Sequence, residues 1–160
     1  MQDKAQLVNR FNQAREGSRA VLAGIDTHLE IYPGWTIKEV LAHLAGWDDA
    51  TIMALNAFVA HDPPPTPASI GLDAYNEQTV EQRHSLDYRQ IVEEWELIRE
   101  QLLKVLANVP EEMLTAKIVS PWGDLVTVEQ LVNIMINHER EHSEIVKTRS
   151  ANPQDPPGAH

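Results

Sequence analysis

Four long stretches of this chain repeat apolar residues at steps of three and four, which is the spacing of one face of an α-helix. The first covers residues 3–25, and the others begin at Thr36, near Asp87 and at Thr127. Each of the last three starts with a capping residue that is followed three positions later by Glu or Gln, a pattern typical of helix N-termini. Little strand signal accompanies them. The sequence therefore predicts an all-α fold, an antiparallel four-helix bundle.

Proline marks the connections between these helices. The run HDPPPTP must end the second helix, and residues 61–72 form a long Pro-rich connection that allows a crossover. A shorter helix is predicted at residues 73–83, and AKIVSPWGDLVTV predicts a short hairpin or an extended loop. Residues 150–160 are polar and Pro-rich, so we expect a disordered tail there. Residues 1–149 then form the single bundle domain.

Composition excludes several kinds of site and partner. The chain has 160 residues and no cysteine, so disulfides and thiolate metal sites are excluded. No apolar run is long enough to span a membrane, and the N-terminus does not resemble a secretory signal, so we expect a cytoplasmic protein with no membrane partner. The formal net charge is −11 and no basic cluster offsets it, which predicts no nucleic-acid partner.

Three histidines are placed where they could share a metal ion. His138 and His142 project about 40° apart on their helix, inside its apolar face. Imidazole is costly in an apolar core unless its nitrogens find partners, and this spacing suits chelation of one metal ion from a single helix. His43 lies at the edge of the second helix's apolar face and could supply a third nitrogen. In the alternative interpretation, the histidines pack in a structural bundle and satisfy each other through hydrogen bonds.

The segment from His138 to His142 also matches the HExxH pattern of zinc proteases. Position 145 is Ile where the extended three-histidine version of the pattern needs glycine, and no sheet is predicted that could bind an extended peptide. A protease is therefore disfavoured. Glu139 is kept as a candidate catalytic base or as a partner that orients a ring N–H, with a salt bridge as the alternative.

Two segments resemble one known family. WTIKEVLAHLAGWDD is similar to the second-helix motif of the DinB/YfiT-like superfamily, and TVEQLVNIMINHEREHSEIVK is similar to its last-helix motif. The resemblance covers nearly the whole chain. It implies an up-down-down-up four-helix bundle, often a homodimer, with a divalent metal ion held by His43, His138 and His142. Similar proteins include thiol-dependent transferases and isomerases that use mycothiol or bacillithiol.

A three-histidine metal ion with open positions predicts an enzyme that acts on a small molecule. It could activate water, as in a hydrolase, or a low-molecular-weight thiol, as in an S-transferase, and the sequence does not choose between them. Zn²⁺ or Ni²⁺ is expected first, and three imidazoles also accept Fe²⁺ or Mn²⁺. A protein that binds a metal ion or small molecule without catalysis is the alternative.

Other polar and aromatic residues are candidates for the pocket. Trp47 lies one turn after His43 and could form a wall of a cofactor or substrate pocket, and Trp122 could cover its mouth. Tyr75 and Asn76 could line the same pocket. Asp48 and Asp49 are expected to be solvated. The alternative for Asp48, which falls nearer the core side of its helix, is that it caps or bridges helices.

Overall fold

The computed structural model describes residues 3–158 and is mainly helical, which confirms the all-α prediction. The α-helices of the described part are α1 (Lys4–Leu22), α2 (Ile37–Ala60), α3 (Leu72–Glu81), α4 (Tyr88–Asn108) and α5 (Val128–Ala151). Two 3₁₀ turns, η1 (Pro67–Ile70) and η2 (Glu111–Met113), and an antiparallel pair of strands, β1 (Lys117–Val119) and β2 (Leu125–Thr127), complete it. None of the described helices is long and apolar enough to cross a membrane.

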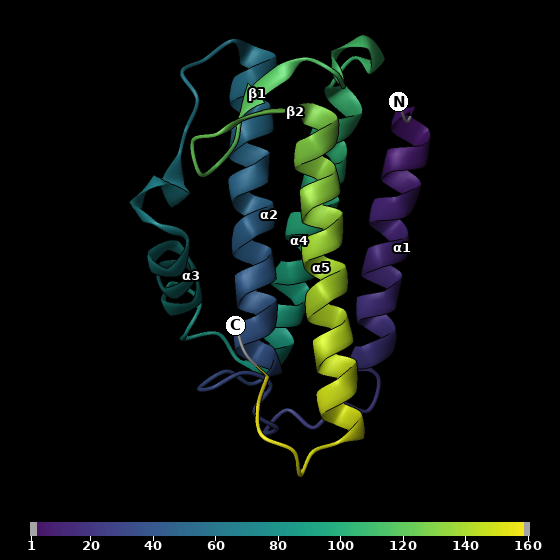
Figure 1. Cartoon of the computed structure of the whole chain (residues 1–160), viewed down its shortest axis with the longest axis vertical. Coiled ribbons are helices and arrows are strands. Elements are labelled where there is room, and N and C mark those ends of the chain that lie inside the picture. The colour runs from purple at the N-terminus through teal and green to yellow at the C-terminus, as the bar shows by residue number, and fades with distance from the viewer. Residues whose placement is uncertain (1–2, 159–160) are drawn as a thin grey trace.

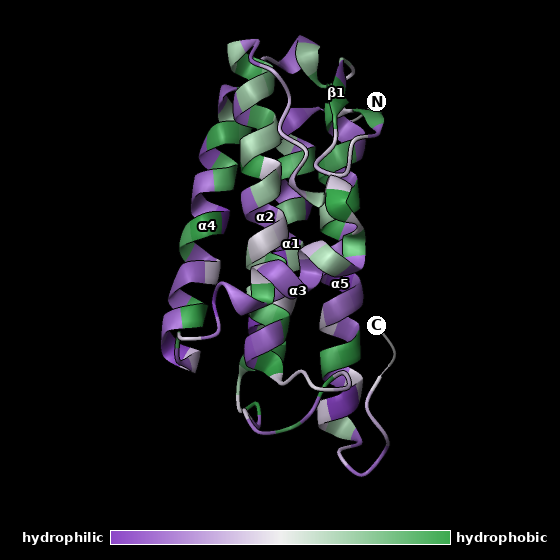
Figure 2. Cartoon of the chain, turned by 90° about the vertical axis from the view of Figure 1, so that its left-hand side faces the viewer, coloured by the Kyte–Doolittle hydropathy of each residue, from purple (hydrophilic) through white to green (hydrophobic). Residues whose placement is uncertain are grey.

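The four long helices lie side by side along the long axis of the molecule (Figure 1). α1 and α5 run in one direction, and α2 and α4 run in the other (Figure 1). α2 packs chiefly on α4, and α1 chiefly on α5, so the helices are arranged as two pairs. α3 lies outside α2, within the long connection to α4 (Figure 1). Hydrophobic and hydrophilic residues alternate along the long helices (Figure 2), as expected when each helix buries one face.

The predicted helix starts are confirmed by their caps. The Glu39 carboxylate accepts from the backbone N–H of Thr36 at 2.8 Å at the start of α2. At the start of α5, Thr127 and Gln130 exchange the two reciprocal hydrogen bonds of a capping box, at 2.8 and 3.0 Å. Asp87 and Gln90 do the same for α4. These bonds satisfy N–H groups that the first turn of a helix leaves without partners.

The C-terminal segment differs from the prediction. α5 continues to Ala151, and the described residues after it turn back along the protein. The backbone N–H of Gly158 donates to the carbonyl of Ile31 at 3.0 Å, and the Arg149 side chain donates to the carbonyls of Glu30 and Asp155. The disorder predicted for residues 150–160 is therefore not confirmed, because several backbone groups of this segment have hydrogen-bond partners.

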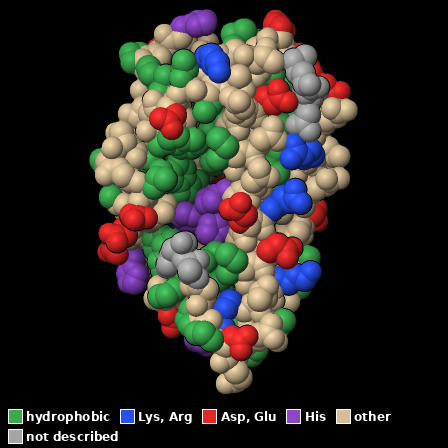
Figure 3. All heavy atoms as spheres, in the orientation of Figure 1, with side chains coloured by type: hydrophobic (Ala, Val, Ile, Leu, Met, Phe, Trp, Pro, Cys, Tyr) green, Lys and Arg blue, Asp and Glu red, His purple; other side chains and the backbone are tan. Residues whose placement is uncertain are grey.

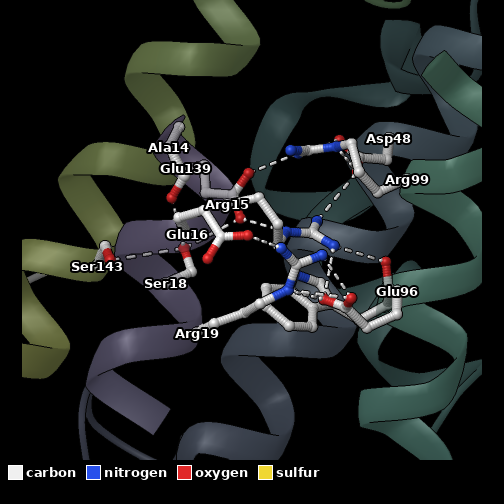
Figure 4. A network of polar contacts seen from close by, with 11 residues as sticks. Ala14, Arg15, Glu16, Ser18, Arg19, Asp48, Glu96, Arg99, Glu139 and Ser143 are labelled. Atoms are coloured by element: carbon white, nitrogen blue, oxygen red, sulfur yellow. Dashed lines mark hydrogen bonds and ion pairs between the residues drawn. The ribbon is translucent and has the colours of Figure 1, made fainter. Parts of the chain in front are cut away.

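A charge network joins the four long helices inside the core (Figure 4). Each helix contributes one residue, namely Arg15 from α1, Asp48 from α2, Arg99 from α4 and Glu139 from α5, and all four are at most 3% exposed. Arg99 donates to Asp48 at 2.8 Å and to Glu139 at 2.5 Å, and Arg15 donates to Glu139 at 2.7 Å. Asp48 thus bridges helices. The expectation that Asp48 is solvated is wrong, because Arg99 and Arg15 give its carboxylate charged partners inside the core.

The network satisfies most of its own polar atoms. Burial raises the pKa of Glu139, but the charges of Arg99 and Arg15 outweigh that effect and hold the pKa below its usual value. The Arg15 guanidinium lies 3.6 Å from the centre of the Trp95 ring, which gives the cation a second favourable contact. Two arginines face two buried carboxylates, and Arg15 also lies 3.3 Å from the partly exposed carboxylate of Glu96.

α3 approaches α2 closely at one glycine. A Cβ atom on Gly46 would lie 1.9 Å from Thr79 Oγ1 and 2.7 Å from Thr79 Cβ, so a side chain there would push α3 away. The Tyr75 hydroxyl, also from α3, donates to the carbonyl of Gly46 at 2.7 Å. Gly46 therefore sets the distance at which α3 packs on α2.

We expect the substitution Gly46→Ala to destabilise the protein by about 1–3 kcal/mol, because the added methyl group overpacks the contact between α2 and α3. Gly17→Ala is the matched control, since Gly17 lies in α1 and a Cβ atom added there would meet no other atom within 4 Å. There we expect stabilisation of about 0.5–1 kcal/mol from helix propensity. Urea unfolding of both variants measures the difference. Equal effects in the two helices would contradict the close approach.

We expect Glu139→Gln to destabilise the protein by about 3–5 kcal/mol, since it leaves the buried guanidinium groups of Arg15 and Arg99 with Asp48 as their one buried carboxylate partner. The control is Glu144→Gln on the same helix, where the side chain is exposed and a change within about 0.5 kcal/mol is expected. Chemical denaturation of the two variants gives both values. A loss below about 1 kcal/mol for Glu139→Gln would show that the network does not hold the helices together.

Candidate metal centre

The structure brings His43, His138 and His142 together. His43 comes from α2, and the other two come from successive turns of α5. Their Nε2 atoms form a triangle with sides of 2.8 Å between His43 and His138, 3.1 Å between His43 and His142, and 3.1 Å between His138 and His142. The convergence expected from the helical positions of these residues is therefore present.

One histidine of the cluster is buried, and the other two, His138 and His142, are partly exposed. His43 is 4% exposed, and burial lowers the pKa of His138 to about 4, with the Glu139 carboxylate opposing that shift. The His138 ring is therefore neutral near pH 7 and keeps a lone pair available for a metal ion. His28, His61 and His84 lie outside this cluster.

The triangle of nitrogens fits a metal ion better than it fits hydrogen bonding. Each Nε2 has a single in-plane site, which holds either a proton or a lone pair, so three converging nitrogens can form at most one good hydrogen-bonded pair. Three nitrogens about 2.0–2.1 Å from one ion lie about 3.3 Å apart at tetrahedral angles and about 2.9 Å apart at right angles. The sides of 2.8–3.1 Å lie close to these separations.

A turn before α2 supplies a partner for one of the three rings. Tyr32, Pro33, Gly34 and Trp35 form a β-turn in which the Trp35 N–H donates to the Tyr32 carbonyl at 2.9 Å and Gly34 has a φ of 79°. Such a φ favours glycine after proline in a type II turn. The Tyr32 hydroxyl oxygen lies 2.6 Å from Nδ1 of His142.

Tyr32 is 1% exposed, and burial, together with the Glu141 carboxylate, raises its pKa to about 12. Its hydroxyl therefore stays protonated near pH 7. When Nε2 of His142 offers its lone pair to a metal ion, the ring proton resides on Nδ1 and can donate to this oxygen. Trp35, at the other end of the turn, lies 5.3 Å from the His43 ring between ring centres. One turn thus contacts two of the three histidines.

The three histidines line a cavity of about 450 Å³, which is within the usual range for small-molecule sites. The face drawn in Figure 3 shows histidine side chains in a hollow at its centre, with hydrophobic side chains around them. The other described residues that line the cavity are Trp35, Trp47, Leu72, Asn76, Trp122, Ile134, Met135, Asn137 and Glu141. Ile134, an apolar position of α5, is 38% exposed because its part of the helix faces this cavity.

Both tryptophans selected from the sequence line the cavity. The Trp47 indole N–H donates to Oδ1 of Asn76 at 2.8 Å, which ties this amide to the tryptophan. Trp122 lies 6.0 Å from Trp47 between ring centres, and its own N–H donates to Asp124. Tyr75 instead packs edge-on against Trp47 and is 8% exposed. That the two tryptophans bind a cofactor stays a prediction.

Glu139 lies elsewhere. It does not line the cavity, and its oxygens accept from Arg15, Arg99 and Ser18 within the core network. The salt-bridge alternative considered for this residue describes these contacts, while its role as a catalytic base stays a prediction. Sequence reasoning missed Tyr32, which precedes the helix in a loop and whose only signal was the Pro-Gly turn after it.

Solved structures share this fold. The colibactin self-resistance protein ClbS, in complex with a dsDNA, superposes with a TM-score of 0.79 at 13% identity, covering 94% of this chain and 97% of ClbS. A mycothiol-dependent maleylpyruvate isomerase superposes with a TM-score of 0.71 at 17% identity, covering 91% of this chain and 63% of the isomerase. At these identities the likeness shows the fold alone.

The ClbS complex corrects one prediction. The acidic net charge of −11 predicts no nucleic-acid partner, and that exclusion is wrong because a protein of this fold is seen with dsDNA. The physical reason is that net charge sums the whole surface and does not report how charge is distributed on any one face.

Sequence comparisons agree with the fold. The uncharacterized protein YuaE of Bacillus subtilis (strain 168) is 28% identical over 145 residues, which are 82% of this chain and 90% of YuaE. Residues 10–146 match the family described as the DinB superfamily, a span that contains the whole three-histidine cluster. By that match, this chain belongs to the DinB superfamily.

Proposed function

We propose that this chain is a metal-dependent enzyme that acts on a small molecule through a divalent ion held by His43, His138 and His142. The observation that carries the proposal is the triangle of Nε2 atoms, which hydrogen bonding alone cannot satisfy. The cavity beside it supports catalysis over a purely structural role, because a structural metal site is normally closed by protein ligands on all sides.

Zn²⁺ or Ni²⁺ is the ion we expect first, with Fe²⁺ or Mn²⁺ as alternatives that imidazole also accepts. Bound here, such an ion would act as a Lewis acid toward water, as in a hydrolase, or toward a low-molecular-weight thiol, as in an S-transferase. The mycothiol dependence of the maleylpyruvate isomerase supports including the thiol. The same cavity could serve a binding protein without catalysis, and turnover of a substrate separates the two.

The residues around the cluster have distinct roles in this proposal. The three histidines are the metal ligands, and the Tyr32 hydroxyl keeps the proton of His142 on Nδ1. Trp47 and Trp122 form apolar walls that exclude water from the bound molecule.

We also propose that residues 1–149 form an up-down-down-up four-helix bundle and that this bundle dimerises. Sedimentation equilibrium measures the mass of the assembly, and the mass of a single chain would contradict dimerisation.

We expect the protein to contain close to one equivalent of a divalent metal when it is purified without a nickel column or chelators, measured by plasma mass spectrometry. His43→Ala and His142→Ala should each lose most of it, since removing one of three ligands leaves a two-coordinate site. His61→Ala is the control, because His61 is exposed and outside the cluster. Absence of metal, even after incubation with Zn²⁺ and Ni²⁺, would overturn the proposal.

We expect Tyr32→Phe to weaken metal binding by about 10–100-fold, the usual effect of removing a partner that orients a metal-ligating histidine. Competition with a chromophoric chelator measures the affinity, and ¹⁵N NMR of the histidine rings reports whether the His142 proton still resides on Nδ1. Tyr88→Phe is the matched control, since Tyr88 is at the start of α4 and does not line the cavity. Unchanged affinity in Tyr32→Phe would remove Tyr32 from the metal site.

A further inference from the structure

The walls of the three-histidine cavity restrict the kind of molecule that fits it. Three tryptophans, Trp35, Trp47 and Trp122, line it together with aliphatic side chains, so most of its surface offers dispersion contacts and ring faces. Trp47 is 6% exposed and is held in place by its hydrogen bond to Asn76 and by the Tyr75 ring. These contacts fix the orientation of the Trp47 ring in the cavity wall.

Charge restricts the ligand further. Among the described residues that line the cavity, none is Lys or Arg, and the ionisable side chain besides the histidines is the carboxylate of Glu141. Phosphate and carboxylate groups are normally bound by guanidinium or ammonium groups, which this lining lacks. A bound divalent ion would attract one anionic group of the ligand. A second negative charge held inside the cavity would lose hydration against the tryptophans, and at the cavity rim it would meet the exposed carboxylate of Glu141, which repels it.

Two amides complete the polar surface. Asn76 and Asn137 line the cavity, and Oδ1 of Asn76 is occupied by the Trp47 N–H, which leaves its NH₂ group as a donor. Such a donor suits an uncharged acceptor such as a carbonyl oxygen. A cationic group would also be accepted, because tryptophan faces and a carboxylate both attract cations.

We propose that the ligand of this cavity has an apolar, preferably aromatic, body and carries no negative charge beyond the group that binds the metal. Nucleotides, sugar phosphates and polycarboxylates are thereby excluded as substrates. This inference rests on the proposed three-histidine metal site, and Glu141 is its specificity-determining residue.

Hydroxamic acids test the inference, because the same metal-binding hydroxamate group can carry different substituents. When two such compounds are compared, the contribution of the hydroxamate to the binding free energy cancels. The full-length protein is loaded with Zn²⁺, its metal content is measured first, and each probe is titrated by calorimetry at low ionic strength. Benzohydroxamic acid should bind about tenfold or more tightly than acetohydroxamic acid, because its ring is buried against the tryptophans. Trp47→Ala should remove most of that gain.

The second comparison varies the charge of the substituent on the benzohydroxamic acid ring. 4-Carboxybenzohydroxamic acid should bind about fivefold or more weakly than benzohydroxamic acid, and 4-(aminomethyl)benzohydroxamic acid should bind at least as tightly. Glu141→Gln should reduce the difference in affinity between the anionic and the cationic probe. Glu144→Gln should leave it unchanged, since Glu144 is an exposed carboxylate of the same helix that does not line this cavity.

The outcomes separate the two proposals. A protein that takes up no Zn²⁺ refutes the metal site itself. A protein that holds one equivalent of Zn²⁺ and binds the carboxylated probe as tightly as the parent compound keeps the metal site and overturns the ligand class. Zinc-loaded protein that binds none of the aromatic probes also overturns the ligand class.

Discussion

The buried charge network formed by Arg15, Asp48, Arg99 and Glu139 is the interaction on which the rest of this structure depends. It takes one residue from each long helix, and it joins the α1–α5 pair to the α2–α4 pair in the middle of the core. The network also fixes how α5 is rotated about its own axis, and that rotation decides where the histidines point. Glu139 and its neighbour His138 project about 100° apart on α5, so the ion pairs that hold Glu139 toward the core also fix the direction of His138 toward the cavity. A turn of α5 about its axis would break the network and disperse the histidine triangle together.

Features encoded by local spacing could be predicted from the sequence. The caps at Thr36, Asp87 and Thr127 depend on contacts between residues three apart, and His138 and His142 share a face because a helix repeats every 3.6 residues. The short hairpin follows from β-branched residues around a turn. These elements needed no knowledge of how the helices pack. The meeting of His43 with His138 and His142 was also predicted, but that prediction drew on the family resemblance. The sequence of α2 by itself does not determine which helix packs against it.

Features that depend on packing between distant segments could not be predicted in the same way. Arg15 and Arg99 look like ordinary charged positions on their helices, and only the folded core shows them at 1% and 3% exposure beside two carboxylates. Tyr32 meets His142 across 110 residues of sequence. The exclusion of nucleic acid was wrong for a related reason, because a net charge carries no information about the arrangement of charges on the surface. Glu139 is a further example. The HExxH pattern lies within one helix and suggests a catalytic base, whereas the arginines that bind this glutamate come from two other helices.

The position of the histidine triangle would give a bound metal ion a second role, in stability, besides the proposed chemistry. His43 belongs to the α2–α4 pair, while His138 and His142 belong to the α1–α5 pair, so the triangle is a second connection between the pairs. A ligand that binds the folded chain and not the unfolded chain stabilises the fold in proportion to the logarithm of its concentration relative to its dissociation constant. An ion held here would therefore strengthen the junction that the charge network already holds. Without it, the Nε2 atoms of three rings, each with one in-plane site, meet in a space where at most one pair can form a good hydrogen bond. The network holds the helices in register, and an ion bound here would remove the conflict among the nitrogens that this register brings together.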